Sequence, residues 1–404
     1  LTENTRQVWR DADGQVHIAP QFRNRIIGLV VVYIIFLWIF PIPLWQSGRF
    51  LLPGQHPQMA EARAWLEGSL TLPVRMWDSA VHEGKIYSHF PPFMTFLSLA
   101  ILPLSPGGIP FALLSLLFVL PIPGLAYVLF LKRCGSVLPA VVFACTFVLG
   151  TSEFSLLCRV LQSGNVWQLN NAIAQLGLLL FLLDYFGKKR LWLGGIGLLI
   201  CGWTRYTTIA YLAPFLWIAL RRDETRRGSK AWAIGAGLLL VAVPPVLNTL
   251  KFGNPFKTGY MEIYVDRDTE IATRAREHGL FSPVFIPDNL YWMNLGFPSF
   301  EEHRDQLRWK PNLWSTGIWW TTPLLVYLLV DIRRIWSTRE NRWLLASVGV
   351  IFLALMMFHN PGWTQPGYNR FSMDFVLPLM ALIAPFAMEG WRKYVTPPLA
   401  IWSV

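Results

Sequence analysis

The strongest pattern along the chain is a series of long apolar runs separated by short polar segments. A helix that crosses a bilayer needs about 20 mostly apolar residues, because hydrocarbon offers no partner for an unpaired backbone group. The pattern therefore predicts an all-α, polytopic integral membrane protein. The candidate spans are residues 26–44, 109–131, 137–154, 166–183, 231–250, 318–330, 343–358 and 371–388.

Two shorter apolar runs, 191–203 and 207–220, flank Arg205. We interpret them as a helical pair that meets near the outer surface of the membrane. With this pair, the expected total is about ten transmembrane helices. Whether the apolar stretch 397–404 begins a further span is left open.

Charged residues make up 15% of the chain, whereas soluble domains have about 25%. The net charge of +11 could indicate nucleic-acid binding, but the basic residues gather at alternate ends of the apolar runs, as the positive-inside rule describes. This placement predicts a multi-pass protein of the bacterial inner (cytoplasmic) membrane with a cytoplasmic N-terminus. It also predicts contact with anionic membrane lipids and no nucleic-acid partner. The basic clusters are Arg23/Arg25, Lys132/Arg133, 188–190, 221–230, 333–342 and Arg392/Lys393.

Two predicted outer segments, 46–92 and 251–312, are longer than a connection between helices requires. Long loops with structure of their own usually carry function. We therefore interpret residues 1–404 as a single transmembrane domain whose outer face carries the chemistry.

The first of these loops contains recognisable elements. Residues 58–67 are expected to form an amphipathic helix that ends at Gly68. A turn is expected at Glu83-Gly84. The apolar run after Pro91-Pro92 is too short to span, and we interpret it as an interfacial or re-entrant helix.

The second loop is more varied. Residues 266–278 are strongly charged and are expected to form an exposed helix. Residues 281–300 are aromatic and predict a segment that lies against the membrane surface, where Trp and Tyr are favoured.

Several stretches, in a shared order, resemble the GT-C glycosyltransferase superfamily, and most of all bacterial family 39-like proteins related to protein O-mannosyltransferases and aminoarabinose transferases. The resemblance covers nearly the whole chain. It implies a GT-C fold and inverting transfer of a sugar from a polyprenyl-phosphate donor to an acceptor on the periplasmic face. It also implies an acidic base in the first loop and basic outer groups around the donor phosphate, with no cofactor. The stretches are 62–70, 78–92, 164–167, 203–205, 252–260 and 360–375.

The chain departs from the family at the usual position of the acid, because residues 53–58 contain no carboxylate. Three residues remain as candidate bases. Asp78 best fits a matching position, Glu61 is nearest to the vacant one, and His56 lies beside it. A carboxylate next to an acceptor hydroxyl can take its proton. The alternative for each is a structural role in a loop or helix cap.

Lys85, Arg205 and Arg370 are candidate ligands of the donor phosphate. Each is flanked by apolar or aromatic sequence on the predicted outer side. A phosphate leaving group gains charge as the glycosidic bond breaks, and cations stabilise that charge. The alternative is contact with lipid headgroups or pairing with an acid such as Asp374.

Aromatic side chains are candidates for stacking on the sugar or the prenyl chain, although interfacial belts of Trp explain many of them equally well. The candidates for the lining of the substrate cavity are Tyr87, Trp167, Tyr260, Trp363 and Tyr368.

We expect no metal site. Asp266-Arg267-Asp268 has the form of a metal-binding DxD motif, but it lies in a charged run that predicts a solvated helix. The histidines and the four cysteines lack the spacing of metal ligands.

Two functions remain open. The first is sugar transfer from a polyprenyl-phosphate donor. The second, favoured by the missing acid, is a non-catalytic GT-C-like scaffold or an accessory subunit of a larger membrane complex. A transporter is less favoured, because no inverted repeat relates the halves of the chain.

Overall fold

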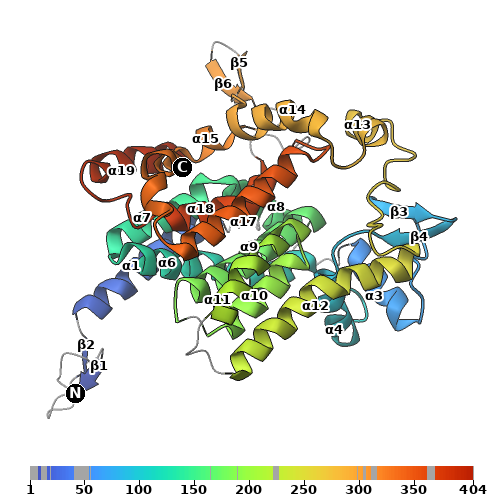
Figure 1. Cartoon of the computed structure of the whole chain (residues 1–404), viewed down its shortest axis with the longest axis horizontal. Coiled ribbons are helices and arrows are strands. Elements are labelled where there is room, and N and C mark those ends of the chain that lie inside the picture. The colour runs from blue at the N-terminus through green and yellow to red at the C-terminus, as the bar shows by residue number, and fades with distance from the viewer. Residues whose placement is uncertain are drawn as a thin grey trace.

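A computed structural model describes residues 8–10, 16–18, 20–40, 54, 56–163, 165–188, 190–221, 227–297, 299–303, 306–310, 316–361 and 369–403. This part of the chain is mostly helical, as predicted, with three small antiparallel hairpins (Figure 1). The hairpins are β1–β2 (Val8–Arg10, Val16–Ile18), β3–β4 (Ser79–His82, Lys85–Ser88) and β5–β6 (Ser299–His303, Gln306–Lys310).

The α-helices differ widely in length. They are α1 (Pro20–Ile39), α3 (Pro57–Leu66), α4 (Phe93–Ile101), α5 (Phe111–Val119), α6 (Pro121–Cys134), α7 (Val137–Gly150), α8 (Ser152–Ser163), α9 (Val166–Tyr185), α10 (Trp192–Gly202), α11 (Leu212–Arg221), α12 (Arg227–Phe252), α13 (Glu270–His278), α14 (Ile286–Leu290), α15 (Ile318–Thr321), α16 (Val326–Ile335), α17 (Arg339–Met356), α18 (Met373–Ile383) and α19 (Arg392–Ser403). Short 3-10 and π-helical turns join them: η2 (Leu102–Leu104), η3 (Tyr206–Tyr211), η4 (Pro283–Phe285), η5 (Tyr291–Leu295), η6 (Pro323–Leu325) and η7 (Arg370–Ser372).

Helices of membrane-spanning length are present. Within the described residues, Pro20–Ile39, Phe111–Cys134 and Arg227–Phe252 are long and apolar enough to cross a bilayer. The pair α7–α8 meets the same criterion as one span with a bend of 60°. A membrane protein is therefore supported, while the expected total of about ten spans stays a prediction.

Three of the predicted spans are wrong as continuous helices. In the run 371–388, a 3-10 turn precedes α18, which ends at Ile383. The run 318–330 is divided into α15, η6 and α16, and the division falls at Pro323. Proline has no backbone N–H and its ring clashes with the preceding turn of a helix. A helix therefore ends before Pro323 even though the surrounding residues are apolar. The run 137–154 ends as a helix at Gly150 and resumes in a new direction at Ser152.

The bundle is centred on α9, which packs against α6, α8, α10 and α18. The contact with α10 is close, because a Cβ on Gly177 would lie 2.6 Å from the carbonyl oxygen of Gly197. Small residues allow such helices to approach, and this is the usual basis of helix packing in membranes.

The two long loops pack against each other at one end of the bundle, at the right of Figure 1. The predicted helix of the first loop is confirmed as α3, and Glu83 and Gly84 form the expected turn with φ of 50° and 73°. The predicted helix at 266–278 begins only at Glu270, because Thr269 caps it by accepting a hydrogen bond from Ala272. A shared apolar cluster joins the loops: Ala80, Tyr87, Phe252, Ile263, Tyr264, Ile271, Ala272 and Ala275.

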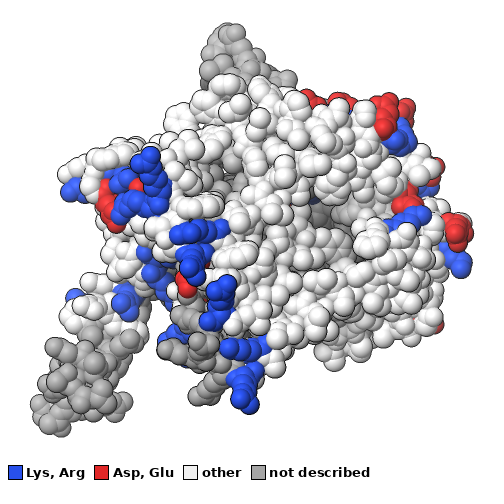
Figure 2. Space-filling view, in the orientation of Figure 1, with Lys and Arg blue, Asp and Glu red and all other residues white. Residues whose placement is uncertain are grey.

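Surface charge is distributed unevenly over the molecule. Figure 2 shows Lys and Arg concentrated over helix ends at the left of the view, whereas acidic and basic side chains are mixed at the right edge. Basic residues occupy the last turns of α6, α11 and α16. The two ends of the bundle therefore differ in charge.

Candidate functional site

Asp78 lies where the first loop enters β3, and its environment is polar and enclosed. The residue is 8% exposed and has a φ of 61°. Positive φ is uncommon for a residue with a side chain, and such conformations gather at functional sites. Asp78 Oδ1 lies 2.5 Å from a guanidinium nitrogen of Arg267 in the second loop. The Asp266–Asp268 segment is therefore not the solvated helix that its charge predicted. Arg267 is a site residue that the sequence interpretation did not identify.

Aromatic residues surround this ion pair. The ring of His89 lies edge-on against Tyr260, with 4.5 Å between centroids. Burial lowers the pKa of His89 to about 3, so its ring is neutral at physiological pH. Tyr264, next in the second loop, pairs through its hydroxyl with His359 Nε2 at 2.9 Å.

Three of the predicted site residues act electrostatically on Tyr260. Burial raises the pKa of Tyr260, the positive charges of Arg205 and Arg370 lower it, and the negative charge of Asp78 raises it. All three charges therefore lie within electrostatic reach of one phenol. Asp78 comes from the first loop, Arg205 from the start of η3 and Arg370 from η7. The structure thus brings together residues from distant parts of the chain.

Arg205 forms an ion pair with the carboxylate of Asp374. Such a pair was the predicted alternative to binding the donor phosphate. Arg205 Nε and Nη2 donate to the two oxygens of Asp374 at 2.5 and 2.7 Å. Thr207 donates its hydroxyl to the same carboxylate at 2.5 Å, and Tyr211 donates to the Asp374 backbone carbonyl. Asp374 is completely buried. This bidentate pair fixes the guanidinium and balances its charge, so an incoming anion would share it with Asp374.

Glu61 forms a second buried ion pair nearby. Its carboxylate contacts the Lys251 ammonium and accepts a hydrogen bond from Thr95 at 2.6 Å. Tyr206 is within electrostatic reach of both Glu61 and Tyr260, which connects this pair to the cluster around Asp78. Lys251, at the end of α12, is 6% exposed and was not identified from the sequence. Its position directly after a long apolar run was the available signal.

The remaining predicted site residues are not members of these ion pairs. His56 is buried and stacks on Phe111 at 4.2 Å, as a packed loop residue does. Lys85 is exposed beside the β3–β4 turn. Tyr87 packs edge-on against Phe252 in the core between the loops.

Trp167 is half-buried in the first turn of α9, and its backbone N–H donates to the side-chain oxygen of Asn165, which caps the helix. Trp363 and Tyr368 lie outside the described residues. Within the described part of the chain, three or more His, Cys, Asp or Glu side chains do not gather in a way that could hold a metal ion.

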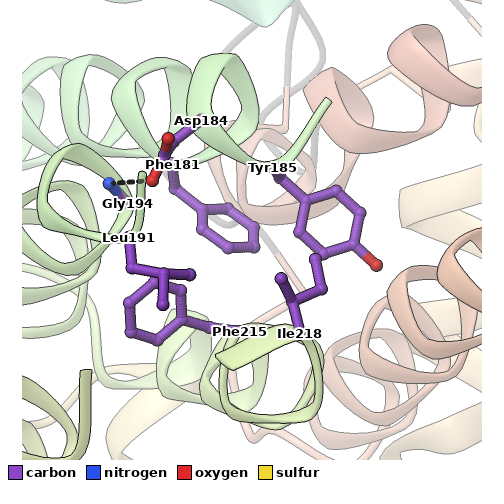
Figure 3. Close-up of a pocket in the computed structure, with 7 residues that line it drawn as sticks. All are labelled: Phe181, Asp184, Tyr185, Leu191, Gly194, Phe215 and Ile218. Carbon is purple, nitrogen blue, oxygen red and sulfur yellow. Dashed lines mark hydrogen bonds between the residues drawn. The ribbon is translucent and has the colours of Figure 1, made fainter. Parts of the chain in front are cut away.

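Two cavities lie outside the charged cluster. A cavity of about 10 Å³ sits between α9, α10 and α11, where Asp184 accepts hydrogen bonds from the backbone of Arg190 and Gly194 (Figure 3). The cavity has room for about one water molecule. Asp184 therefore caps the start of α10 and does not bind a larger ligand. An apolar groove of about 300 Å³ runs between α15, α16, α17 and α18 and is lined by Phe352 and Phe375.

Comparison of the chain with protein-family models, with curated proteins and with solved structures found no match. The functional interpretation therefore rests on the residues and their geometry.

Proposed function

We propose that this chain is a GT-C-like membrane glycosyltransferase that moves a sugar from a polyprenyl-phosphate donor to an acceptor on the periplasmic side. The observation that carries the proposal is that the charges of Asp78, Arg205 and Arg370 all act on Tyr260. An acid, two cations and an aromatic ring suit a sugar phosphate. The acid can act as the base, the cations can bind the phosphate, and the ring can stack on the sugar.

In this proposal Asp78 accepts the proton of the acceptor hydroxyl while the acceptor oxygen bonds to the anomeric carbon. The bond between the anomeric carbon and the phosphate oxygen breaks, and its electron pair leaves with the phosphate. Arg370 stabilises the charge that develops on this leaving group. Arg267 orients the base through its ion pair with Asp78. Arg205, fixed by Asp374, supports the phosphate from its other side.

The apolar groove supports a lipid-linked donor. Phe375 lines the groove and directly follows Asp374, the partner of Arg205. A prenyl chain that enters this groove from the bilayer exchanges one apolar environment for another, so van der Waals packing against the groove would hold it. The charge asymmetry of Figure 2 is consistent with a cluster on the side opposite the cytoplasm.

One observation favours the second candidate, a non-catalytic scaffold or an accessory subunit of a larger complex. The charged groups of the cluster are largely paired with one another: Asp78 with Arg267, Glu61 with Lys251, and Arg205 with Asp374. Charges that satisfy each other stabilise a fold without a ligand. Binding of a donor distinguishes the two functions.

The test uses the purified protein and a radiolabelled polyprenyl-phosphate sugar. We expect the wild type to bind it and the Arg370→Gln variant to bind it about tenfold to a hundredfold more weakly, because one charge-assisted phosphate contact is lost. Asp78→Asn keeps the shape of the side chain and removes the base, so it should retain binding and lose transfer.

The control is Lys393→Gln, which removes an exposed charge on α19. Its affinity for the donor should equal that of the wild type. If the folded wild type binds no donor, the transferase proposal fails and the scaffold is favoured.

A further inference from the structure

The break between α7 and α8 encloses a carboxyl group that the proposed transfer reaction does not use. Glu153, in the first turn of α8, is completely buried. Neither of its carboxylate oxygens has a hydrogen-bond donor among the described residues. An ionised carboxylate without a partner is strongly disfavoured in a protein interior, so Glu153 requires a positive partner or a proton.

The nearby face of α9 offers further oxygen atoms. Gln168, Asn171 and Gln175 follow one another at helical spacing and therefore share a face. All three are buried, and their amide oxygens have no donor among the described residues. Such a surface suits a hard metal cation, which is coordinated by oxygen atoms.

Contacts at the start of α18 bring Glu153 and Gln175 to the same place. Gln175 donates its amide nitrogen to the Met373 backbone carbonyl at 3.0 Å. Thr151 accepts a hydrogen bond from the Glu153 backbone N–H at 3.1 Å, and its hydroxyl lies 3.8 Å from the sulfur of Met373. Helices α8 and α9 also pack along each other. Met373 therefore links Glu153, through Thr151, to Gln175.

The broken helix itself favours a cation at this point. The last carbonyl groups of α7 have no partner within the helix, and the C-terminal end of a helix is the negative end of its dipole. Discontinuous helices use such carbonyls to bind monovalent cations in membrane transporters. The chain bends here by 60°, and Thr151 at the bend is extended.

We propose that the break between α7 and α8 binds a monovalent alkali cation, with the Glu153 carboxylate and the Gln175 amide oxygen as ligands. One carboxylate balances one positive charge, whereas a divalent ion would leave a net charge in the interior. Two basic side chains lie on α8 or on the η7 turn that packs against it: Arg159, further along α8, and Arg370, which acts on Tyr260 and Tyr264 in the second loop. Neutral oxygen atoms complete the coordination of hard cations.

The test measures the melting temperature of the full-length protein in detergent while NaCl or KCl replaces choline chloride at constant ionic strength. A ligand that binds only the folded state raises its stability in a saturable way. We expect a saturable rise of several degrees with Na⁺ or K⁺. In Glu153→Gln we expect no response to either ion and a melting temperature in choline at least equal to that of the wild type, because the buried charge is gone.

The matched control is Glu277→Gln, which removes an exposed carboxylate on α13 and should keep the full response. A second variant, Gln175→Met, should shift the midpoint of the rise to higher cation concentration. The inference is overturned if the wild type does not respond to Na⁺ or K⁺, if it responds only to Mg²⁺ or Ca²⁺, or if Glu153→Gln retains the response. Because the readout is independent of donor binding, it stands apart from the proposed transferase function.

Discussion

Two buried ion pairs in the described part of the chain join residues that are far apart in the sequence. Glu61 meets Lys251 and Asp78 meets Arg267, so each pair joins the first loop to the second loop or to the end of α12. The exposed pair Arg75–Asp266 joins the same loops, but its side chains are 51% and 57% exposed. Burial decides how much each pair matters, since water screens an exposed pair and does not screen an enclosed one.

The Glu61–Lys251 pair gives a prediction at this scale. Lys251→Met should destabilise the fold by about 3–5 kcal/mol, because it leaves the Glu61 carboxylate buried without its cation. Adding Glu61→Leu should recover most of that loss, since the pair is then replaced by apolar groups. Thermal unfolding in detergent measures both effects.

The exposed pair supplies the control for this cycle. Arg75→Ala should cost at most about 1 kcal/mol. Equal costs for Lys251→Met and Arg75→Ala would show that the Glu61–Lys251 pair is not enclosed as described.

The existence of most helices could be predicted from the sequence, and their breaks could not. Apolar runs located α1, α9, α12 and α17 because burial in a bundle or a bilayer requires a long apolar stretch. The same runs gave no sign of the bend at Thr151, because apolar composition is identical in straight and broken helices. The hairpin β3–β4 was anticipated only as a turn, because its strands are four residues each.

Site prediction shows a similar division. The acids were chosen by their positions in the stretches that resemble the GT-C family, and the arginines because charges beside apolar runs are costly and therefore informative. Their partners Arg267 and Lys251 were missed because pairing between loops depends on the fold. Asp374 was named as a possible partner of Arg205, and the structure confirms that pair.

The β3–β4 hairpin and the second loop should separate in mild acid. Burial lowers the pKa of His89 to about 3 and that of His359 to about 4, whereas an unfolded histidine titrates near 6.5. Between these values the unfolded chain binds protons that the folded chain does not, so stability falls as the pH decreases below 6.5. Hydrogen exchange of the hairpin amides, corrected for intrinsic rates, should therefore show weaker protection at pH 5 than at pH 7.

A matched variant assigns this effect to its source. His89→Gln should reduce the loss of protection on going from pH 7 to pH 5, leaving the part that His359 contributes. The amides of α9, which carry no buried histidine, provide the reference. Equal hairpin protection at the two pH values in the wild type would contradict the assignment.

At the scale of the whole molecule, the two ends of the bundle differ in charge and in structure. One end carries the basic last turns of α6, α11 and α16. The other carries the packed loops with Asp78, Tyr260 and Arg267. The proposed function requires these ends to lie on opposite sides of a membrane, with the loops outside, because the lipid-linked donor of the GT-C reaction is used there.

Labelling of single cysteines tests this arrangement most directly. Lys85→Cys places a thiol beside the exposed β3–β4 turn, and Arg227→Cys places one at the exposed start of α12, each in a background with the four native cysteines replaced by serine. With a membrane-impermeant thiol reagent, we predict that the Lys85→Cys protein reacts in cells with a permeabilised outer membrane and an intact inner membrane. The Arg227→Cys protein should react only after the inner membrane is opened. Reaction of both proteins from the same side, or of Arg227→Cys alone from outside, would contradict the account.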